Sequence, residues 1–114
     1  MRRVVVTGLG IVSSIGNNAA EVIASLREAK SGIVAAPKYK ELGFRCQVEG
    51  AVKIDLDAAI DRRARRFMGD TAAYAFLAME QAIKDSGLVE ADIVHERTGL
   101  IGRASCRERV SNCV

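Results

Sequence analysis

Apolar residues change their spacing from one segment of the chain to the next, and this spacing predicts alternating strands and helices. A β-branched run at Arg3–Thr7 stops at a glycine and is typical of a buried strand. Apolar residues recur at helical spacing in Ala19–Lys30 and, more strongly, in Thr71–Ser86. The second of these segments carries an apolar stripe, which we expect to face the core: Ala72, Ala75, Phe76, Met79, Ala82 and Ile83.

Capping residues mark the ends of both predicted helices. Asn18 followed by Glu21 resembles a capping box and predicts the start of the first helix. Gly32 and Gly87 follow the last apolar positions of the two helices and predict where they end.

The remaining segments predict further strands and connections. Alternating apolar and polar residues in Phe44–Val52 indicate a half-buried strand, with Cys46 on its apolar face as filler of the core. Ile33–Gly43 is interpreted as a surface excursion and Val89–Arg97 as a polar connection, in which the single histidine is an exposed loop residue. Thr98–Ile101 is predicted to begin a further strand, in the same sheet as Arg3–Thr7. This order predicts half of a layered α/β domain.

Composition limits the classes of protein to which the chain can belong. A length of 114 residues allows one small domain, and 49% hydrophobic residues suffice for a core. No apolar run approaches the length of a transmembrane helix. The net charge of +3 gives no argument for nucleic-acid binding, because Arg103, Arg107 and Arg109 against Glu108 supply +2 of it. Only one cysteine precedes residue 101, which fits a reducing cytoplasm.

The character of the sequence changes at Ile101. Residues 1–101 are interpreted as a partial folded domain, whereas residues 102–114 do not continue its patterning. The run Ile101–Val110 resembles one reading frame of a DNA-sequencing library adapter, so we interpret residues 102–114 as a non-native, disordered tail. Cys106 and Cys113 in this tail match no common zinc signature.

A glycine loop at Gly8–Asn18 follows the first strand and precedes the first helix, the context of a dinucleotide-binding fingerprint. Gly8 and Gly10 fit that fingerprint, but Ser13 occupies the place of its third glycine. The lysine of a phosphate-binding loop is also missing. We therefore favour a tight structural turn over nucleotide binding, and we expect no cofactor or metal.

A basic segment, Asp61–Met68, contains four arginines within five residues and is predicted to be a short helix or turn. Arg62 and Arg66 are four residues apart and share a helix face, with Arg63 beside them. Such a cluster suits an acidic partner. A solvated surface, with arginines paired to neighbouring aspartates, is an equally good interpretation of these residues alone. The pattern of the chain contains no catalytic constellation.

Several blocks of the sequence, taken in order, resemble the opening of the β-ketoacyl-acyl-carrier-protein synthases, and in particular their synthase I branch. The resemblance covers residues 1 to about 101 and is carried by Val5–Asn18, Ala24–Arg27, Ser31–Ile33, Arg66–Met68 and Tyr74–Ile83. It implies a thiolase-like α/β/α/β/α fold, of which this chain is an N-terminal fragment. It also implies a homodimeric cytoplasmic enzyme of fatty-acid elongation.

The resemblance carries only one set of functional residues onto this chain. Basic residues at the positions of Arg62, Arg63 and Arg66 help to dock the acidic acyl carrier protein in this branch. The family's catalytic cysteine and two histidines come later than this sequence reaches, so no catalytic residue is assigned and we expect the fragment to be inactive. The alternatives are a carrier-protein-binding module without catalysis and, less favoured, a nucleotide-binding α/β domain.

Overall fold

The computed structural model describes residues 2–103, which belong to two compact units. The continuous unit comprises residues 12–54, and the discontinuous unit combines residues 2–11 with residues 55–103. All but the first two residues of the 102–114 tail lie outside the described part of the chain, so its predicted disorder stays a prediction.

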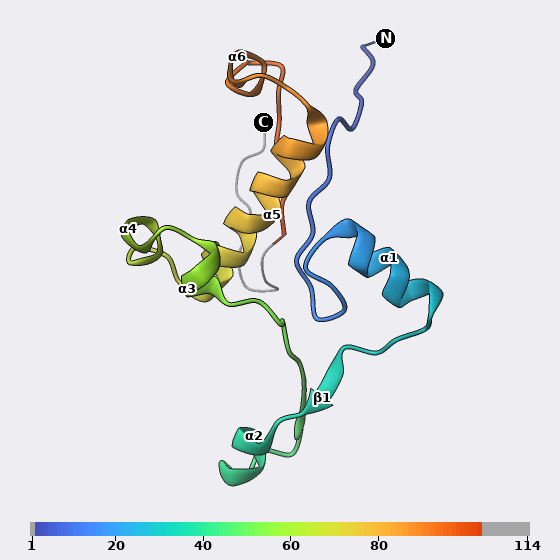
Figure 1. The fold of residues 1–114 in the computed structure, drawn as a ribbon, viewed down its shortest axis with the longest axis vertical. Coiled ribbons are helices and arrows are strands. Elements are labelled where there is room, and N and C mark those ends of the chain that lie inside the picture. Colours follow the sequence, from blue (N-terminus) through green and yellow to red (C-terminus); the bar gives the residue numbers. More distant parts are fainter. Residues whose placement is uncertain (1, 104–114) are drawn as a thin grey trace. The chain divides into compact units, whose positions relative to one another are not determined.

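The continuous unit contains a helix followed by a β-hairpin (Figure 1). Helix α1 (Ala19–Arg27) precedes strand β1 (Ile33–Ala35), which pairs antiparallel with β2 (Val48–Gly50). The connection between the strands contains the short helix α2 (Pro37–Glu41). The surface excursion predicted for this region is therefore an ordered hairpin extension.

The start of α1 confirms the predicted cap at Asn18, but the return bond of the predicted capping box reaches the preceding residue, Asn17, instead of Asn18. The Asn18 side chain accepts a hydrogen bond of 3.0 Å from the backbone N–H of Glu21. In return, the Glu21 carboxylate accepts one of 2.8 Å from the backbone N–H of Asn17. The bond from Glu21 satisfies one N–H group that the first turn of the helix leaves unpaired, and the bond from Asn17 fixes the residue before the cap.

The end of α1 differs from the prediction, because the helix stops at Arg27 rather than at Gly32. Ala29 adopts a φ of 52°, the left-handed conformation that usually falls to glycine after a helix. Its N–H donates to the Leu26 carbonyl, and the Lys30 N–H donates to the Ser25 carbonyl. This pair of bonds is a Schellman motif built on an alanine.

The discontinuous unit contains four helices: α3 (Leu56–Ala59), α4 (Arg62–Arg65), α5 (Asp70–Ser86) and α6 (Glu90–Ile93). Helix α5 confirms the strongest helix prediction, and Gly87 with a φ of 64° ends it as expected. Helix α6 lies within the segment that was predicted to be a polar connection. Within residues 2–103, no helix has the length and apolarity needed to cross a membrane.

The core of the discontinuous unit lies between α3 and α5. Leu56 and Ile60 are 8% and 4% exposed, and Ala73 and Leu77 of α5 are 0% and 8% exposed. The predicted stripe of α5 is therefore the wrong face, since Met79 and Ile83 lie at the surface and Phe76 is only partly buried. Helix α5 carries apolar residues on more than one side, so spacing alone did not select the side that α3 covers.

A second side of α5 contacts the N-terminal segment. Backbone N–H groups of Leu9 and Ile11 donate to the side chains of Asp85 and Gln81 at 3.0 and 3.2 Å. A Cβ atom at Gly10 would lie 1.7 Å from the Ala78 carbonyl oxygen, and one at Gly8 would be nearly as close to the helix. The two glycines thus let this segment approach the helix backbone closely.

Three predicted strands need correction. Arg3–Thr7 and Thr98–Ile101 contain no strand, and Val4 and Val6 are 95% and 86% exposed. A strand needs a neighbouring strand to pair with, and neither segment belongs to the β1–β2 sheet that the structure describes within residues 2–103. Within Phe44–Val52, only the last part of the alternating run pairs, as β2. In the described part of the chain, the predicted layered α/β arrangement is thus represented only by helices and one two-stranded sheet.

Candidate functional site

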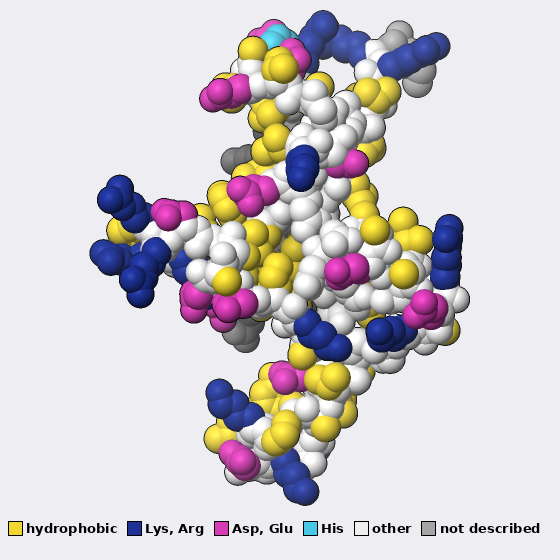
Figure 2. Space-filling model, viewed as in Figure 1, with side chains coloured by type: hydrophobic (Ala, Val, Ile, Leu, Met, Phe, Trp, Pro, Cys, Tyr) yellow, Lys and Arg dark blue, Asp and Glu magenta, His cyan; other side chains and the backbone are white. Residues whose placement is uncertain are grey.

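The basic segment forms helix α4, as the sequence predicted, and α4 displays most of its arginines to solvent. Asp61 caps the helix by accepting a 3.2 Å hydrogen bond from the backbone N–H of Arg63. The side chains of Arg62, Arg63 and Arg66 are exposed. Figure 2 shows the resulting gathering of basic side chains over α4, at the left of the view. We call these three residues the arginine cluster.

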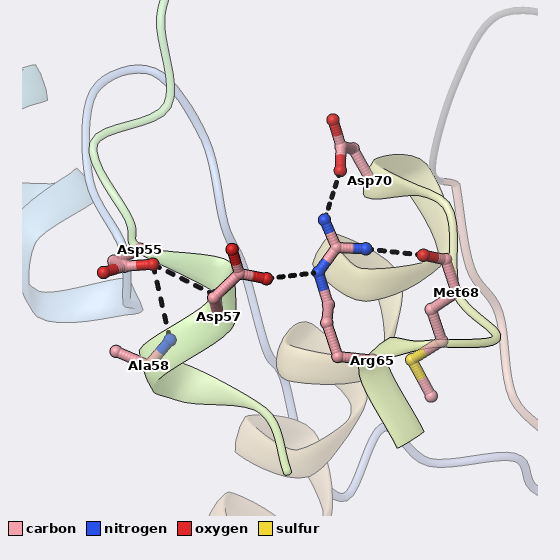
Figure 3. Close-up of polar contacts among 6 residues, drawn as sticks. All are labelled: Asp55, Asp57, Ala58, Arg65, Met68 and Asp70. Carbon is pink, nitrogen blue, oxygen red and sulfur yellow. Dashed lines mark hydrogen bonds and ion pairs between the residues drawn. The ribbon is translucent and has the colours of Figure 1, made fainter. Parts of the chain in front are cut away.

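Arg65 behaves differently from its neighbours, because its side chain is only 22% exposed and its guanidinium lies beside two carboxylates and a carbonyl (Figure 3). Its Nε lies 3.2 Å from a carboxylate oxygen of Asp57 on α3. One terminal nitrogen lies 2.6 Å from a carboxylate oxygen of Asp70, the first residue of α5, and the other donates to the Met68 carbonyl. One guanidinium therefore connects α3, the turn after α4 and the start of α5.

The sequence left two interpretations of the basic segment, a structural one with arginines paired to neighbouring aspartates and a cluster that binds an acidic partner. In the structure, different arginines fit each of them. Arg65 fits the structural one, since it pairs with Asp70 as well as with Asp57. The arginine cluster has no ion-pair partner among residues 2–103, so its guanidinium groups are available to an external acidic group. Its members are the positions to which the family resemblance assigns carrier docking, although that role itself stays a prediction.

Sequence reasoning missed two features of this segment. The first is the structural role of Arg65, for which the only signal was the presence of acidic residues on both sides of the basic run. The second is Phe67, which directly follows the arginine cluster and is 87% exposed. Hydrophobic spacing does not predict an exposed aromatic residue, because the pattern does not distinguish apolar residues of the core from those that stay outside it.

The glycine loop takes the structural role that was favoured. The space in front of Gly8 and Gly10 is occupied by the backbone of α5, so a phosphate group could not approach these glycines there. Further along the loop, Ser13 and Gly16 form a tight turn through reciprocal backbone hydrogen bonds of 2.9 and 3.3 Å. Neither arrangement favours nucleotide binding.

An open hollow of about 310 Å³ lies beside α1 in the continuous unit. Its polar groups are largely engaged within the chain: the Ser25 hydroxyl donates to the Ile15 carbonyl at 2.6 Å, and the Asn17 amide donates to the Lys53 carbonyl at 2.9 Å. Of the charged side chains that line the hollow, Glu28, Lys30 and Lys53 are exposed, so they do not form an enclosed ligand site.

The remaining candidate residues have no catalytic surroundings. Cys46 is exposed rather than buried, which corrects the sequence prediction, and its thiol lies 3.5 Å from the Val48 carbonyl. The pairing of β2 begins after Cys46, so no sheet face covers it. His95 is exposed as predicted, and its Nδ1 accepts a 3.1 Å hydrogen bond from the N–H of Arg97. In the part of the chain that the structure describes, no group of side chains could hold a metal ion.

Comparison with known proteins identifies the family. The chain belongs to the β-ketoacyl synthases: the family description "Beta-ketoacyl synthase, N-terminal domain" matches residues 1–111. The matched region extends past Ile101, the residue at which the sequence interpretation ended the native domain. The origin of residues 102–114 stays a prediction.

Individual relatives carry consistent names. The chain is 48% identical over 116 residues to the 3-oxoacyl-[acyl-carrier-protein] synthase 1 of Haemophilus influenzae, an alignment covering 99% of this chain and 29% of that protein. It is 57% identical over 102 residues to the synthase 1 of Escherichia coli K12, covering 89% of this chain and 25% of the relative. Synthase 2 of Vibrio harveyi is 35% identical over 104 residues, covering 90% of this chain and 24% of that protein. The chain thus spans between about a quarter and a third of their lengths.

Proposed function

We propose that this chain is the N-terminal part of a 3-oxoacyl-acyl-carrier-protein synthase of the synthase I branch. Such an enzyme condenses an acyl thioester with malonyl-carrier protein in fatty-acid elongation. Family membership over residues 1–111 and the shared name of the relatives support this assignment. The complete protein would be a cytoplasmic homodimer with the thiolase-like α/β/α/β/α fold, to which residues 1–101 contribute an N-terminal portion.

The function proposed for the chain itself is to dock the acyl carrier protein through Arg62, Arg63 and Arg66. The observation that carries the proposal is the contrast within the basic segment: Arg65 is paired and partly buried, whereas Arg62, Arg63 and Arg66 are exposed and have no ion pair among the described residues. Guanidinium groups bind carboxylates and phosphates in bidentate fashion, which suits an acidic carrier. Contacts of this kind speed association and weaken with salt.

Chemistry is assigned to residues outside this chain. By resemblance, the family uses a cysteine thiolate as nucleophile and two histidines that stabilise charge on the thioester oxygen. Cys46 and His95 match neither motif, and their described contacts are with backbone groups. We expect the 114-residue chain to show no condensation of acyl and malonyl carrier protein above a no-enzyme blank, and turnover would contradict this assignment. A carrier-binding module without catalysis remains the second candidate, because it would use the same arginines.

The docking proposal can be tested in a chimeric synthase, in which residues 1–101 of this chain replace the matching segment of the Haemophilus enzyme. Changing Arg62, Arg63 and Arg66 to Glu should raise the KM for carrier-bound substrate by at least about tenfold, because like charges then face each other. Reaction with a small acyl thioester, which needs no carrier, should change little.

A matched control separates local docking from the change of net charge. Lys38, Lys40 and Arg45 are also exposed, and changing these three to Glu alters the net charge equally. The control should leave both substrates nearly unaffected. Equal loss on carrier-bound and small substrates in the cluster variant would mean that these arginines hold the fold rather than the carrier.

A further inference from the structure

Phe67 is the most exposed aromatic residue of the described chain, with 87% of its surface accessible. Full burial of a phenylalanine side chain is worth about 1.5–3 kcal/mol, so an aromatic ring left in water is an unused source of binding energy. The small core of Leu56, Ile60, Ala73 and Leu77 leaves Phe67 outside. Its immediate neighbour Arg66 belongs to the arginine cluster.

The backbone that carries Phe67 is held in place on both sides. The N–H of Phe67 donates to the Ala64 carbonyl at 3.2 Å, and that of Met68 donates to the Arg65 carbonyl at 3.1 Å. The Arg65 guanidinium then joins the Met68 carbonyl to Asp70 at the start of α5 (Figure 3). Phe67 is therefore presented on a turn of fixed conformation, and a partner that covers it pays little backbone entropy.

Exposed arginines beside an exposed aromatic ring have the composition of a binding hot spot. Aromatic residues and arginine are enriched where interfaces derive most of their energy, whereas an isolated charge patch acts mainly on the association rate. The arginine cluster selects an acidic partner by charge, and Phe67 offers that partner an apolar contact that salt does not screen.

We propose that Phe67 is the apolar contact of the docking surface, and that the carrier protein covers it with an apolar side chain or pocket that lies beside its acidic residues. This inference rests on the proposed docking role of the arginine cluster, and it adds an apolar contact to that docking surface. Docking through α4 then has a salt-sensitive part from Arg62, Arg63 and Arg66 and a salt-insensitive part from Phe67.

The test measures binding of purified acyl carrier protein to the complete 114-residue chain and to the chimeric synthase, at low and high salt. Phe67→Ala should weaken binding by about tenfold at both salt concentrations, within the range for truncation of an aromatic contact residue. Phe67→Lys separates the two components, because a purely electrostatic surface would bind the acidic carrier more tightly with this added charge. The proposal requires Phe67→Lys to bind more weakly than the unchanged protein.

Controls make each failure distinguishable. Phe44→Ala removes another exposed ring, in the continuous unit, and should leave carrier binding unchanged. If the triple Glu variant loses binding while Phe67→Ala and Phe67→Lys do not, the role of Phe67 is refuted and arginine docking stands. If the triple Glu variant binds normally, the docking function itself fails. A change of sedimentation with Phe67→Ala at constant carrier affinity would show that a second copy of the chain covers the ring, which also overturns the proposal.

Discussion

Arg65 offers the sharpest test of how the discontinuous unit is held together. We expect Arg65→Ala to destabilise this unit, whereas Arg62→Ala on the same helix should leave its stability nearly unchanged. The two arginines are three residues apart in one short helix, but Arg65 contacts α3, the following turn and α5, and Arg62 has no ion pair among the described residues.

The magnitude follows from the surroundings of the Arg65 guanidinium. Its aspartate partners Asp57 and Asp70 are 83% and 73% exposed, so each ion pair is screened by water and contributes about 0.2–1 kcal/mol. The hydrogen bond to the Met68 carbonyl has a charged donor and a half-buried setting, which corresponds to about 1.5–3 kcal/mol. Arg65→Ala should therefore destabilise the unit by about 2–5 kcal/mol, with the Met68 bond as the larger part.

The measurement is urea unfolding of the 114-residue chain, followed by amide exchange across α3, α4 and the first turn of α5. Arg65→Lys keeps the charge but cannot reach three acceptors in different directions, so it should recover less than half of the loss. Raising the salt concentration should reduce the difference in the free energy of unfolding between the unchanged protein and Arg65→Ala only slightly, because the ion pairs contribute the smaller part of that difference. Equal destabilisation by Arg62→Ala and Arg65→Ala would refute the division of α4 into a structural and an exposed set.

Three further changes test other parts of the structure. Ala29→Gly should stabilise the continuous unit by about 1 kcal/mol, because a φ of 52° is unfavourable for alanine, whereas Ala24→Gly inside α1 should destabilise it by about as much. A lower stability of Ala29→Gly in urea unfolding would be inconsistent with the left-handed helix end. Gly10→Ala should remove the amide-exchange protection of Leu9 and Ile11, because its Cβ would lie 1.7 Å from the Ala78 oxygen. Gly99→Ala, whose Cβ would meet nothing within 4 Å, should keep that protection, and protection that persists in Gly10→Ala would rule out the close approach. Asn18→Ala should cost α1 about 1 kcal/mol and lower its helical circular dichroism, and an unchanged signal would mean that the cap contributes nothing.

Local signals in the sequence predicted α1, α4 and α5, because the interactions that define these helices lie within a few residues, whereas the short helices α2, α3 and α6 were not predicted. The cap at Asn18, the stop at Gly87 and the short helix of the basic segment all depend on neighbours close in sequence. The end of α1 was missed for a related reason. The Schellman motif can form on any residue that tolerates a positive φ, and Ala29 gives no compositional sign of doing so.

Predictions that depend on distant partners fared less well. The strand at Arg3–Thr7 required a neighbouring strand, and the described residues provide none. The buried face of α5 depended on which of its apolar sides α3 would cover, and Leu77 rather than Met79 is buried. At the candidate site, the resemblance singled out the arginine cluster, but only the folded structure separates Arg65 from it, because pairing with Asp57 and Asp70 requires α3, α4 and α5 to be in place.

The contact between the N-terminal segment and α5 also sets an order of events during synthesis. Leu9 and Ile11 bond to side chains 76 and 70 residues later in the chain, so the first residues made must wait until α5 has left the ribosome. The continuous unit needs only residues 12–54 and can form earlier. The valines at positions 4–6 are exposed in the described structure as well as during that interval, so a chaperone that recognises extended apolar segments would meet them both before and after the contact with α5 forms.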